Sequence, residues 1–217
     1  MRVKVFVLGL PGSGKSLASR LFMDILKREG WITRPFKDYD ILLEMFRNDS
    51  NQGKFRPTEH DGFDVLDLSM FDLALQEVER RTTDYIGIPH AQNELILIEF
   101  ARNDYRKALK QFSHKLLEDS YFIFINADIP TCISRIHKRV AHPQTLDDHF
   151  VSEYIFDAYY QKDTKQYFAS SLEGIAGVDV QRIRVIDNIG TQDNLRHQVS
   201  QCIDFIFEQE QVLVPIH

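Results

Sequence analysis

The segment from Gly9 to Ser16 reads GLPGSGKS and matches the pattern G-x-x-x-x-G-K-[ST] in full. Glycines let a backbone curl so closely that successive N–H groups point at phosphate oxygens, and a helix that begins there adds its N-terminal partial positive charge. In such a loop Lys15 reaches the β- and γ-phosphates, and the Ser16 hydroxyl is a ligand of Mg²⁺. The segment therefore predicts binding of ATP together with Mg²⁺. The residues expected to hold them are Gly9, Pro11, Gly12, Ser13, Gly14, Lys15 and Ser16.

Acidic residues follow two apolar segments of the chain. Glu99 lies near the end of the run ELILIEF, and Asp38 and Asp40 follow an earlier run. Ligands of parallel α/β sheets bind beyond the carboxyl ends of the strands, so these side chains are candidates for the reacting site. There Glu99 would hold a Mg²⁺-bound water or accept the proton of a substrate hydroxyl. The structural alternatives are an ion pair between Glu99 and Arg102 and helix capping by the aspartates, for which Asp40 is the stronger candidate.

Two arginines, Arg135 and Arg139, are spaced i, i+4 and therefore project from one face of a helix. Two guanidinium groups there would clamp phosphate and neutralise the charge of a transition state. A solvated basic face has the same spacing and is the alternative. We assign Arg135 to nucleotide binding and Arg139 to catalysis, on a lid around residues 130–150. The polar loop around 48–68 is long enough to be a substrate flap.

Four segments resemble those of the P-loop nucleoside and nucleotide kinases, which include thymidylate kinases and deoxynucleoside kinases. They are GLPGSGKS, the EFAR segment from Glu99 to Arg102, the NADIP segment from Asn126 to Pro130 with Arg135 and Arg139 after it, and the VIDN segment from Val185 to Asn188.

The resemblance implies roles for residues that spacing alone does not assign. Asp38 would contact the acceptor and take part in catalysis, Arg102 would bind the substrate, and Asn188 would lie beside the adenine of ATP. Glu99 would be both catalytic and a metal ligand. The kinases place acid and arginine side by side, whereas here two residues separate Glu99 from Arg102. The resemblance also implies the three-layer α/β/α fold of P-loop NTPases with strand order 2-3-1-4-5.

Short apolar segments alternate along the chain with longer segments of helical period, which is typical of βα units around a parallel sheet. The pattern predicts one α/β domain over residues 1–217. Strands are expected at 2–8, 31–36, 94–100, 121–126 and 182–186. Helices are expected at 15–28, 40–46, 69–81, 105–116, 130–140, 150–159 and 195–207. Capping boxes at Ser69–Asp72 and Thr145–Asp148 mark the starts of the third and sixth helices.

Composition narrows the class of protein and its partners. With 217 residues, 43% of them hydrophobic, the chain is globular. Its 26 basic and 32 acidic residues give a net charge of −6, which disfavours large nucleic acid as a partner because that binding neutralises phosphates. Cys132 and Cys202 fit a reduced interior, and no apolar run approaches the roughly 20 residues of a membrane helix. We expect a cytoplasmic protein whose partners are a nucleoside triphosphate and a small-molecule acceptor.

Three classes of function agree with a phosphate-binding loop. The leading hypothesis is a kinase that transfers a phosphoryl group from ATP to a nucleoside, a nucleotide or another small metabolite. A GTPase switch is disfavoured, because the D-x-x-G sequence at Asp84–Gly87 precedes the third strand and no N-K-x-D sequence is present. The third class is an ATP-binding regulator without turnover, against which the retained Lys15, Ser16 and Glu99 argue.

Overall fold

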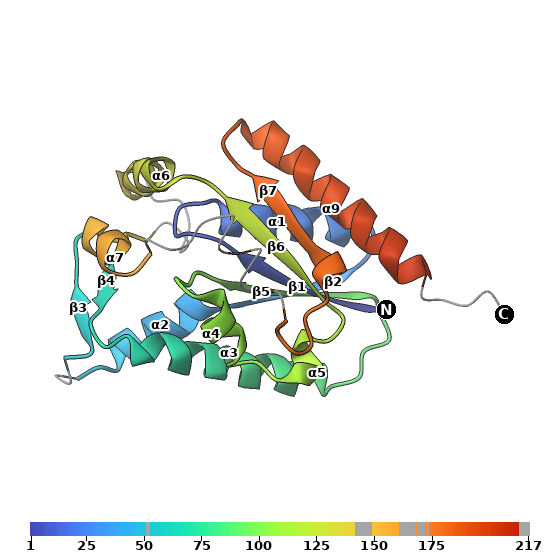
Figure 1. Ribbon diagram of the computed structural model, residues 1–217, viewed down its shortest axis with the longest axis horizontal. Coiled ribbons are helices and arrows are strands. Elements are labelled where there is room, and N and C mark those ends of the chain that lie inside the picture. Colours follow the sequence, from blue (N-terminus) through green and yellow to red (C-terminus); the bar gives the residue numbers. More distant parts are fainter. Residues whose placement is uncertain (51–52, 142–148, 161–167, 169–171, 173, 213–217) are drawn as a thin grey trace.

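A five-stranded parallel sheet runs through the centre of the molecule in the computed structural model (Figure 1). The structure describes residues 1–50, 53–141, 149–160, 168, 172 and 174–212. The strands of the sheet are β1 (Arg2–Leu8), β2 (Ile32–Lys37), β5 (Glu94–Phe100), β6 (Ser120–Asn126) and β7 (Ile183–Asp187). Their spatial order is β2-β5-β1-β6-β7, which confirms the predicted order 2-3-1-4-5.

Alternate residues of the central strands face two separate hydrophobic clusters, because successive side chains of a strand point to opposite faces. Val5 and Val7 of β1 pack in one cluster, and Phe6 and Leu8 pack in the other. All seven residues of β5 are buried. Strands covered on both faces need apolar residues throughout, which is why these runs are almost continuously apolar in the sequence.

Helices cover both faces of the sheet and form the outer layers (Figure 1). On one face lie α1 (Lys15–Arg28) and α9 (Gln192–Val212). On the other lie α2 (Asp38–Arg47), α3 (Ser69–Ile86), α4 (Tyr105–Leu109) and α5 (His114–Leu117). This is the predicted three-layer α/β/α arrangement. No helix in the described part of the chain is both long enough and apolar enough to cross a membrane.

Three further elements lie beyond the carboxyl ends of the strands. They are the antiparallel hairpin of β3 (Phe55–Pro57) and β4 (Phe63–Val65), and the helices α6 (Ile129–Ala141) and α7 (Glu153–Ala158). In Figure 1 they stand together at the left of the molecule. The predicted loop at 48–68 therefore contains a small sheet.

Several predicted helix boundaries and caps are wrong. The helix expected at 105–116 is split into α4 and α5, each capped by its own residue, Asp104 and Ser113. The Ser69–Asp72 capping box does not form, because Asp67 accepts hydrogen bonds from both the backbone and the hydroxyl of Ser69. Asp40 lies inside the first turn of α2 and is not its cap. The Thr145–Asp148 box lies outside the described residues.

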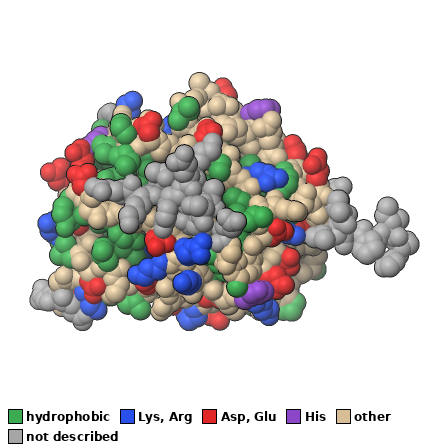
Figure 2. All heavy atoms as spheres, viewed as in Figure 1, with side chains coloured by type: hydrophobic (Ala, Val, Ile, Leu, Met, Phe, Trp, Pro, Cys, Tyr) green, Lys and Arg blue, Asp and Glu red, His purple; other side chains and the backbone are tan. Residues whose placement is uncertain are grey.

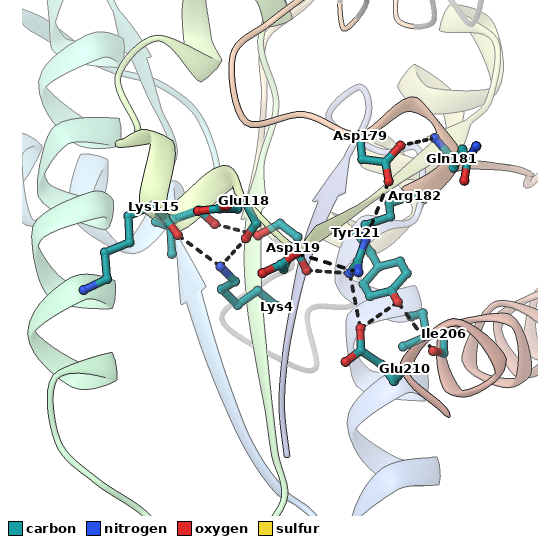
Figure 3. Close-up of polar contacts among 12 residues, drawn as sticks. Lys4, Lys115, Glu118, Asp119, Tyr121, Asp179, Gln181, Arg182, Ile206 and Glu210 are labelled. Atoms are coloured by element: carbon teal, nitrogen blue, oxygen red, sulfur yellow. Dashed lines mark hydrogen bonds and ion pairs between the residues drawn. The ribbon is translucent and has the colours of Figure 1, made fainter. Parts of the chain in front are cut away.

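A polar cluster lies near the amino-terminal ends of β6 and β7 (Figure 3). Arg182, buried before β7, donates hydrogen bonds to the Asp119 carbonyl and to Glu210 of α9. Lys4 of β1 donates to the carbonyl oxygens of Lys115 and Glu118. These contacts connect β1 and the segments just before β6 and β7 to α5 and α9, so the cluster is a structural support.

Candidate active site

The segment between β1 and α1 is a tight loop that only glycine allows at three positions. Gly9, Gly12 and Gly14 have φ angles of 139°, 79° and 103°. A Cβ atom on Gly12 would lie 2.5 Å from the carbonyl oxygen of Cys132, and one on Gly14 would lie 2.3 Å from the side chain of Asn188. The positive φ angles and these close contacts both exclude larger side chains from the loop. The backbone N–H groups of the loop therefore stay accessible to a phosphate.

Lys15 is the first residue of α1 and its side chain crosses the mouth of the loop. It is 8% exposed, and its Nζ donates a hydrogen bond to the carbonyl oxygen of Leu10 at 2.8 Å. An ammonium group at a helix N-terminus opposes the helix dipole, so this position does little for the stability of α1. It places a positive charge where the phosphates of a nucleotide would lie.

Glu99 meets the phosphate loop because β5 and β1 are neighbours in the sheet, with Glu99 opposite Val7. Its two carboxylate oxygens accept hydrogen bonds from Ser16 (2.6 Å) and from Ser19 (2.9 Å) of α1. The carboxylate is almost fully buried. The alternative in which Glu99 pairs with Arg102 is therefore wrong. Ser19 escaped the sequence analysis, although its spacing of three residues from Ser16 puts both hydroxyls on one face of the helix.

The donor atoms at this position fit Mg²⁺. Magnesium in kinases is bound by one or two protein oxygens and completes its octahedron with water and phosphate oxygens. The Ser16 hydroxyl and the Glu99 carboxylate supply two such oxygens within 2.6 Å of each other. No group of three or more His, Cys, Asp or Glu side chains that could hold a metal ion occurs among the described residues.

Asp38 lies at the start of α2, and its carboxylate is bound by the buried side chain of Arg102. The Arg102 guanidinium forms an ion pair with the Asp38 carboxylate and donates to the carbonyl oxygens of Ala101 (2.6 Å) and Phe71 (2.7 Å). Arg102 is 2% exposed. Burial is the largest single effect on the pKa of Arg102 and lowers it, but the Asp38 carboxylate together with Tyr159 and Tyr160 raises this pKa above its ordinary value. The pair arises because the ends of β2 and β5 are adjacent.

Both arginines of α6 donate hydrogen bonds to backbone carbonyl oxygens of other segments. Arg135 donates to the carbonyl oxygens of Ser13 (3.3 Å) and Asn188 (2.8 Å), which connects α6 to the phosphate loop. Arg139 donates through Nε and Nη2 to the carbonyl oxygen of His149. The alternative of a solvated basic face is therefore wrong for this pair. Asn188, after β7, is buried and donates to the Ser13 carbonyl at 2.7 Å.

These side chains surround one cavity of about 310 Å³ at the carboxyl edge of the sheet. The predicted site residues that line it are Pro11, Gly12, Gly14, Lys15, Ser16, Asp38, Glu99, Arg135 and Arg139. Gly9, Ser13, Arg102 and Asn188 are not among the described residues lining it and lie behind those that do.

The wall of the cavity that includes Asp38 is apolar and aromatic, which the sequence analysis missed. The rings of Tyr39 and His149 stack with centroids 3.5 Å apart, and the ring of Phe63 also stacks with Tyr39, with centroids 5.7 Å apart. These rings come from α2, the hairpin and the segment before α7. The remaining apolar lining includes Leu42, Val65, Phe71, Phe150, Val151 and Ile155. Residues so far apart in the chain have no common periodicity that could have revealed them.

Comparison with known proteins supports the fold. No protein-family profile and no curated protein sequence matches this chain. Among solved structures, the Chaetomium thermophilum protein Kti12 in complex with ADP-AlF3 matches 94% of this chain and 98% of its own, with 14% identity and a TM-score of 0.54. The Mycobacterium tuberculosis APS kinase CysC in complex with AMPPNP and APS matches 95% and 97%, with 15% identity and a TM-score of 0.52. The chain has the three-layer fold of the P-loop NTPases, and a kinase is among its structural neighbours.

Proposed function

We propose that this protein is a P-loop kinase that transfers the γ-phosphoryl group of ATP to a hydroxyl group of a small acceptor. The observation that carries the proposal is the shared cavity. Lys15 and Glu99 line it on the side of the phosphate loop, and the buried carboxylate of Asp38 lines it on the neighbouring side. Phosphate-binding groups and a potential proton acceptor thus border one space, which is what transfer between two bound reactants requires.

Phosphoryl transfer depends on positioning and charge stabilisation more than on covalent chemistry by the protein. In the proposed reaction the acceptor oxygen bonds to the γ-phosphorus, the bond from that phosphorus to the β–γ bridging oxygen breaks, and the hydroxyl proton passes to Asp38. Lys15, Arg135 and Arg139 stabilise the charge on the phosphate oxygens. Bound Mg²⁺, held by Ser16 and Glu99, would neutralise charge on the β- and γ-phosphates.

The acceptor that best fits the cavity is a nucleoside or a similar compound with an uncharged ring. The rings of Tyr39 and Phe63 and the side chain of Phe71 favour a flat apolar group. An acceptor that carries its own phosphate would need a cation beside Asp38. Arg102 is the cation in contact with that carboxylate. Its Nη atoms already donate hydrogen bonds to Asp38 and to two backbone carbonyl oxygens, so they are not directed at an acceptor phosphate.

Two segments have the placement expected of moving parts. We assign the predicted substrate flap to the β3–β4 hairpin, from which Phe63 and Val65 line the cavity. We assign the predicted lid to α6, which carries Arg135 and Arg139. Figure 2 shows acidic and basic side chains interspersed on the face in view, which is in line with a small-molecule partner and not with nucleic acid on that face.

The test is a screen for acceptor-dependent release of ADP from ATP and Mg²⁺. Nucleosides, nucleotides and small hydroxy metabolites are compared, with the Lys15→Ala variant as the control that keeps the fold and loses transfer. We expect nucleosides to stimulate ADP release more than their 5′-monophosphates do. A screen without a stimulating compound, together with intact ATP binding, would favour an ATP-binding regulator. Turnover in Lys15→Ala equal to that of the wild type would refute the phosphate-loop assignment.

A further inference from the structure

A buried carboxylate joins the β3–β4 hairpin to the segment that precedes α7. Asp64 lies in the middle of β4, and its side chain is 1% exposed. One of its oxygens accepts a hydrogen bond from Arg56 of β3 and the other accepts one from the Ser152 hydroxyl, both at 2.6 Å. Burial of a charge is costly unless the group is paired and hydrogen-bonded, so the contact needs both partners.

The segment 149–152 that contains Ser152 also holds Arg139. The carbonyl oxygen of His149 accepts hydrogen bonds from Arg139 Nη2 at 2.7 Å and from Nε at 3.1 Å. The His149 ring stacks on Tyr39, which is adjacent to Asp38 in the chain. Only two residues, Phe150 and Val151, thus separate the residue whose hydroxyl binds Asp64 from the residue whose carbonyl binds Arg139.

We propose that Asp64 is a positioning residue for Arg139. By binding Ser152 it fixes the segment 149–152, and the fixed carbonyl of His149 then orients the guanidinium toward the phosphate end of the cavity. A hairpin of two short strands is marginally stable alone, so its place depends on such contacts. The inference rests on the proposed function, because orientation of Arg139 matters only if this side chain acts on the transferred phosphoryl group.

We call the contact of Asp64 with Arg56 and Ser152 the clasp. The packing around the clasp supports a connection between Arg139 and the aromatic wall of the cavity. Gly62, at the turn of the hairpin, lies so close to the segment that a Cβ atom there would be 3.0 Å from the carbonyl oxygen of Phe150. Arg56, besides pairing with Asp64, places its guanidinium 5.3 Å from the centre of the Tyr154 ring in α7. An acceptor bound against Phe63 would therefore lie next to the hairpin whose Asp64 binds Ser152, and so next to the contacts that hold Arg139.

The experiment measures hydrolysis of ATP by water, so it needs no knowledge of the natural acceptor. Asp64→Asn and Ser152→Ala are compared with Arg139→Ala and with the wild type. We expect kcat for ATP hydrolysis to fall roughly 3- to 30-fold in the first two variants, the range of coupling through contacting networks, while the Kd for ADP stays unchanged. Ser152→Thr keeps the hydroxyl and should restore kcat.

Matched controls come from a contact of the same type nearby. Asp67 accepts a hydrogen bond from the Ser69 hydroxyl at 2.7 Å, outside the cavity. Asp67→Asn and Ser69→Ala should leave kcat unchanged. Adding Asp64→Asn to Arg139→Ala should lower kcat no further than Arg139→Ala alone, because both changes interrupt one connection.

Three results would overturn the proposal. They are a wild-type kcat in Asp64→Asn and Ser152→Ala, an additive loss in the double variant, and unchanged hydrogen exchange of residues 149–155 in the two clasp variants without nucleotide. If Arg139→Ala lowers kcat and the clasp variants do not, Asp64 has no positioning role and the proposed function stands. If the wild type neither binds ADP nor hydrolyses ATP, the proposed function fails and this inference with it.

Discussion

Replacement of Arg102 by methionine tests whether this arginine has a structural role, as the buried ion-pair partner of Asp38, and does not bind the acceptor. Methionine fills much of the same space and removes the charge and the donors. The variant leaves the Asp38 carboxylate and the carbonyl oxygens of Ala101 and Phe71 without the hydrogen bonds that Arg102 donates. Loss of one partner of a buried ion pair costs about 3–5 kcal/mol of unfolding free energy. We expect a cost near the lower end, about 3 kcal/mol, because Asp38 borders the cavity and can gain water there.

The assay is urea-induced unfolding, followed by far-UV circular dichroism and by fluorescence of the single tryptophan, Trp31. Trp31 is buried in the cluster between α1 and α9, so its emission reports on global unfolding. Arg81→Met is the matched control, because Arg81 pairs with Glu44 and with Glu77 on the surface, each at 2.6 Å. An exposed pair contributes about 0–1 kcal/mol, so this control should change stability little.

A loss of less than about 1 kcal/mol in Arg102→Met, the value of a surface pair, would refute the argument. A second variant that also replaces Asp38 by leucine should recover most of the lost stability, because an apolar pair avoids the uncompensated charge. If Arg102 instead binds the acceptor directly, Arg102→Met should raise the KM for the acceptor and leave stability unchanged.

Three further predictions concern single side chains. Mg²⁺ should lower the Kd for ADP in the wild type, and in Glu99→Gln this effect of Mg²⁺ should be about 10- to 100-fold smaller. Calorimetric titration of ADP with and without Mg²⁺ measures both values. Hydrogen bonds from Arg80 lower the pKa of Glu77 to about 2 from its ordinary 4.5, so the stability due to Glu77 is full above pH 4.5 and is lost as the pH falls toward 2. The difference in Tm between wild type and Glu77→Gln should vanish over that range, and a constant difference would contradict it. Burial raises the pKa of the Cys202 thiol to about 11, so iodoacetamide at pH 8 should modify the native protein far more slowly than the unfolded protein.

The strands and the phosphate loop are the parts of the fold that the sequence predicts well. β1, β5 and α1 have the predicted boundaries. Their residues form contiguous patterns, an apolar run or a helical period, and burial on both faces of the sheet enforces these patterns locally. The contact between Ser16 and Glu99 then follows from topology, because neighbouring parallel strands bring their carboxyl ends to the same edge.

Elements whose boundaries depend on tertiary contacts were predicted poorly. The expected single helix over 105–116 has an apolar period throughout, but Asp104 and Ser113 each cap a short helix. The hairpin has strands of three residues each, too short for alternation to be visible. Its Asp64 binds a serine 88 residues away, and a contact over such a separation leaves no local signal in the sequence.

The two halves of the cavity are therefore encoded in different ways. Most of the phosphate half comes from eight consecutive residues and from Glu99 of a neighbouring strand, so a local motif specifies the greater part of it, and α6 adds Arg135 and Arg139. The acceptor half combines α2, the hairpin and the segment before α7, which meet only through long-range contacts such as Asp38 with Arg102 and Tyr39 with His149. A change of one ring in that half can alter the shape offered to the acceptor without touching the loop that binds phosphate. Under the proposed function, the motif thus specifies the chemistry of transfer, while the identity of the acceptor depends on packing that the motif does not contain.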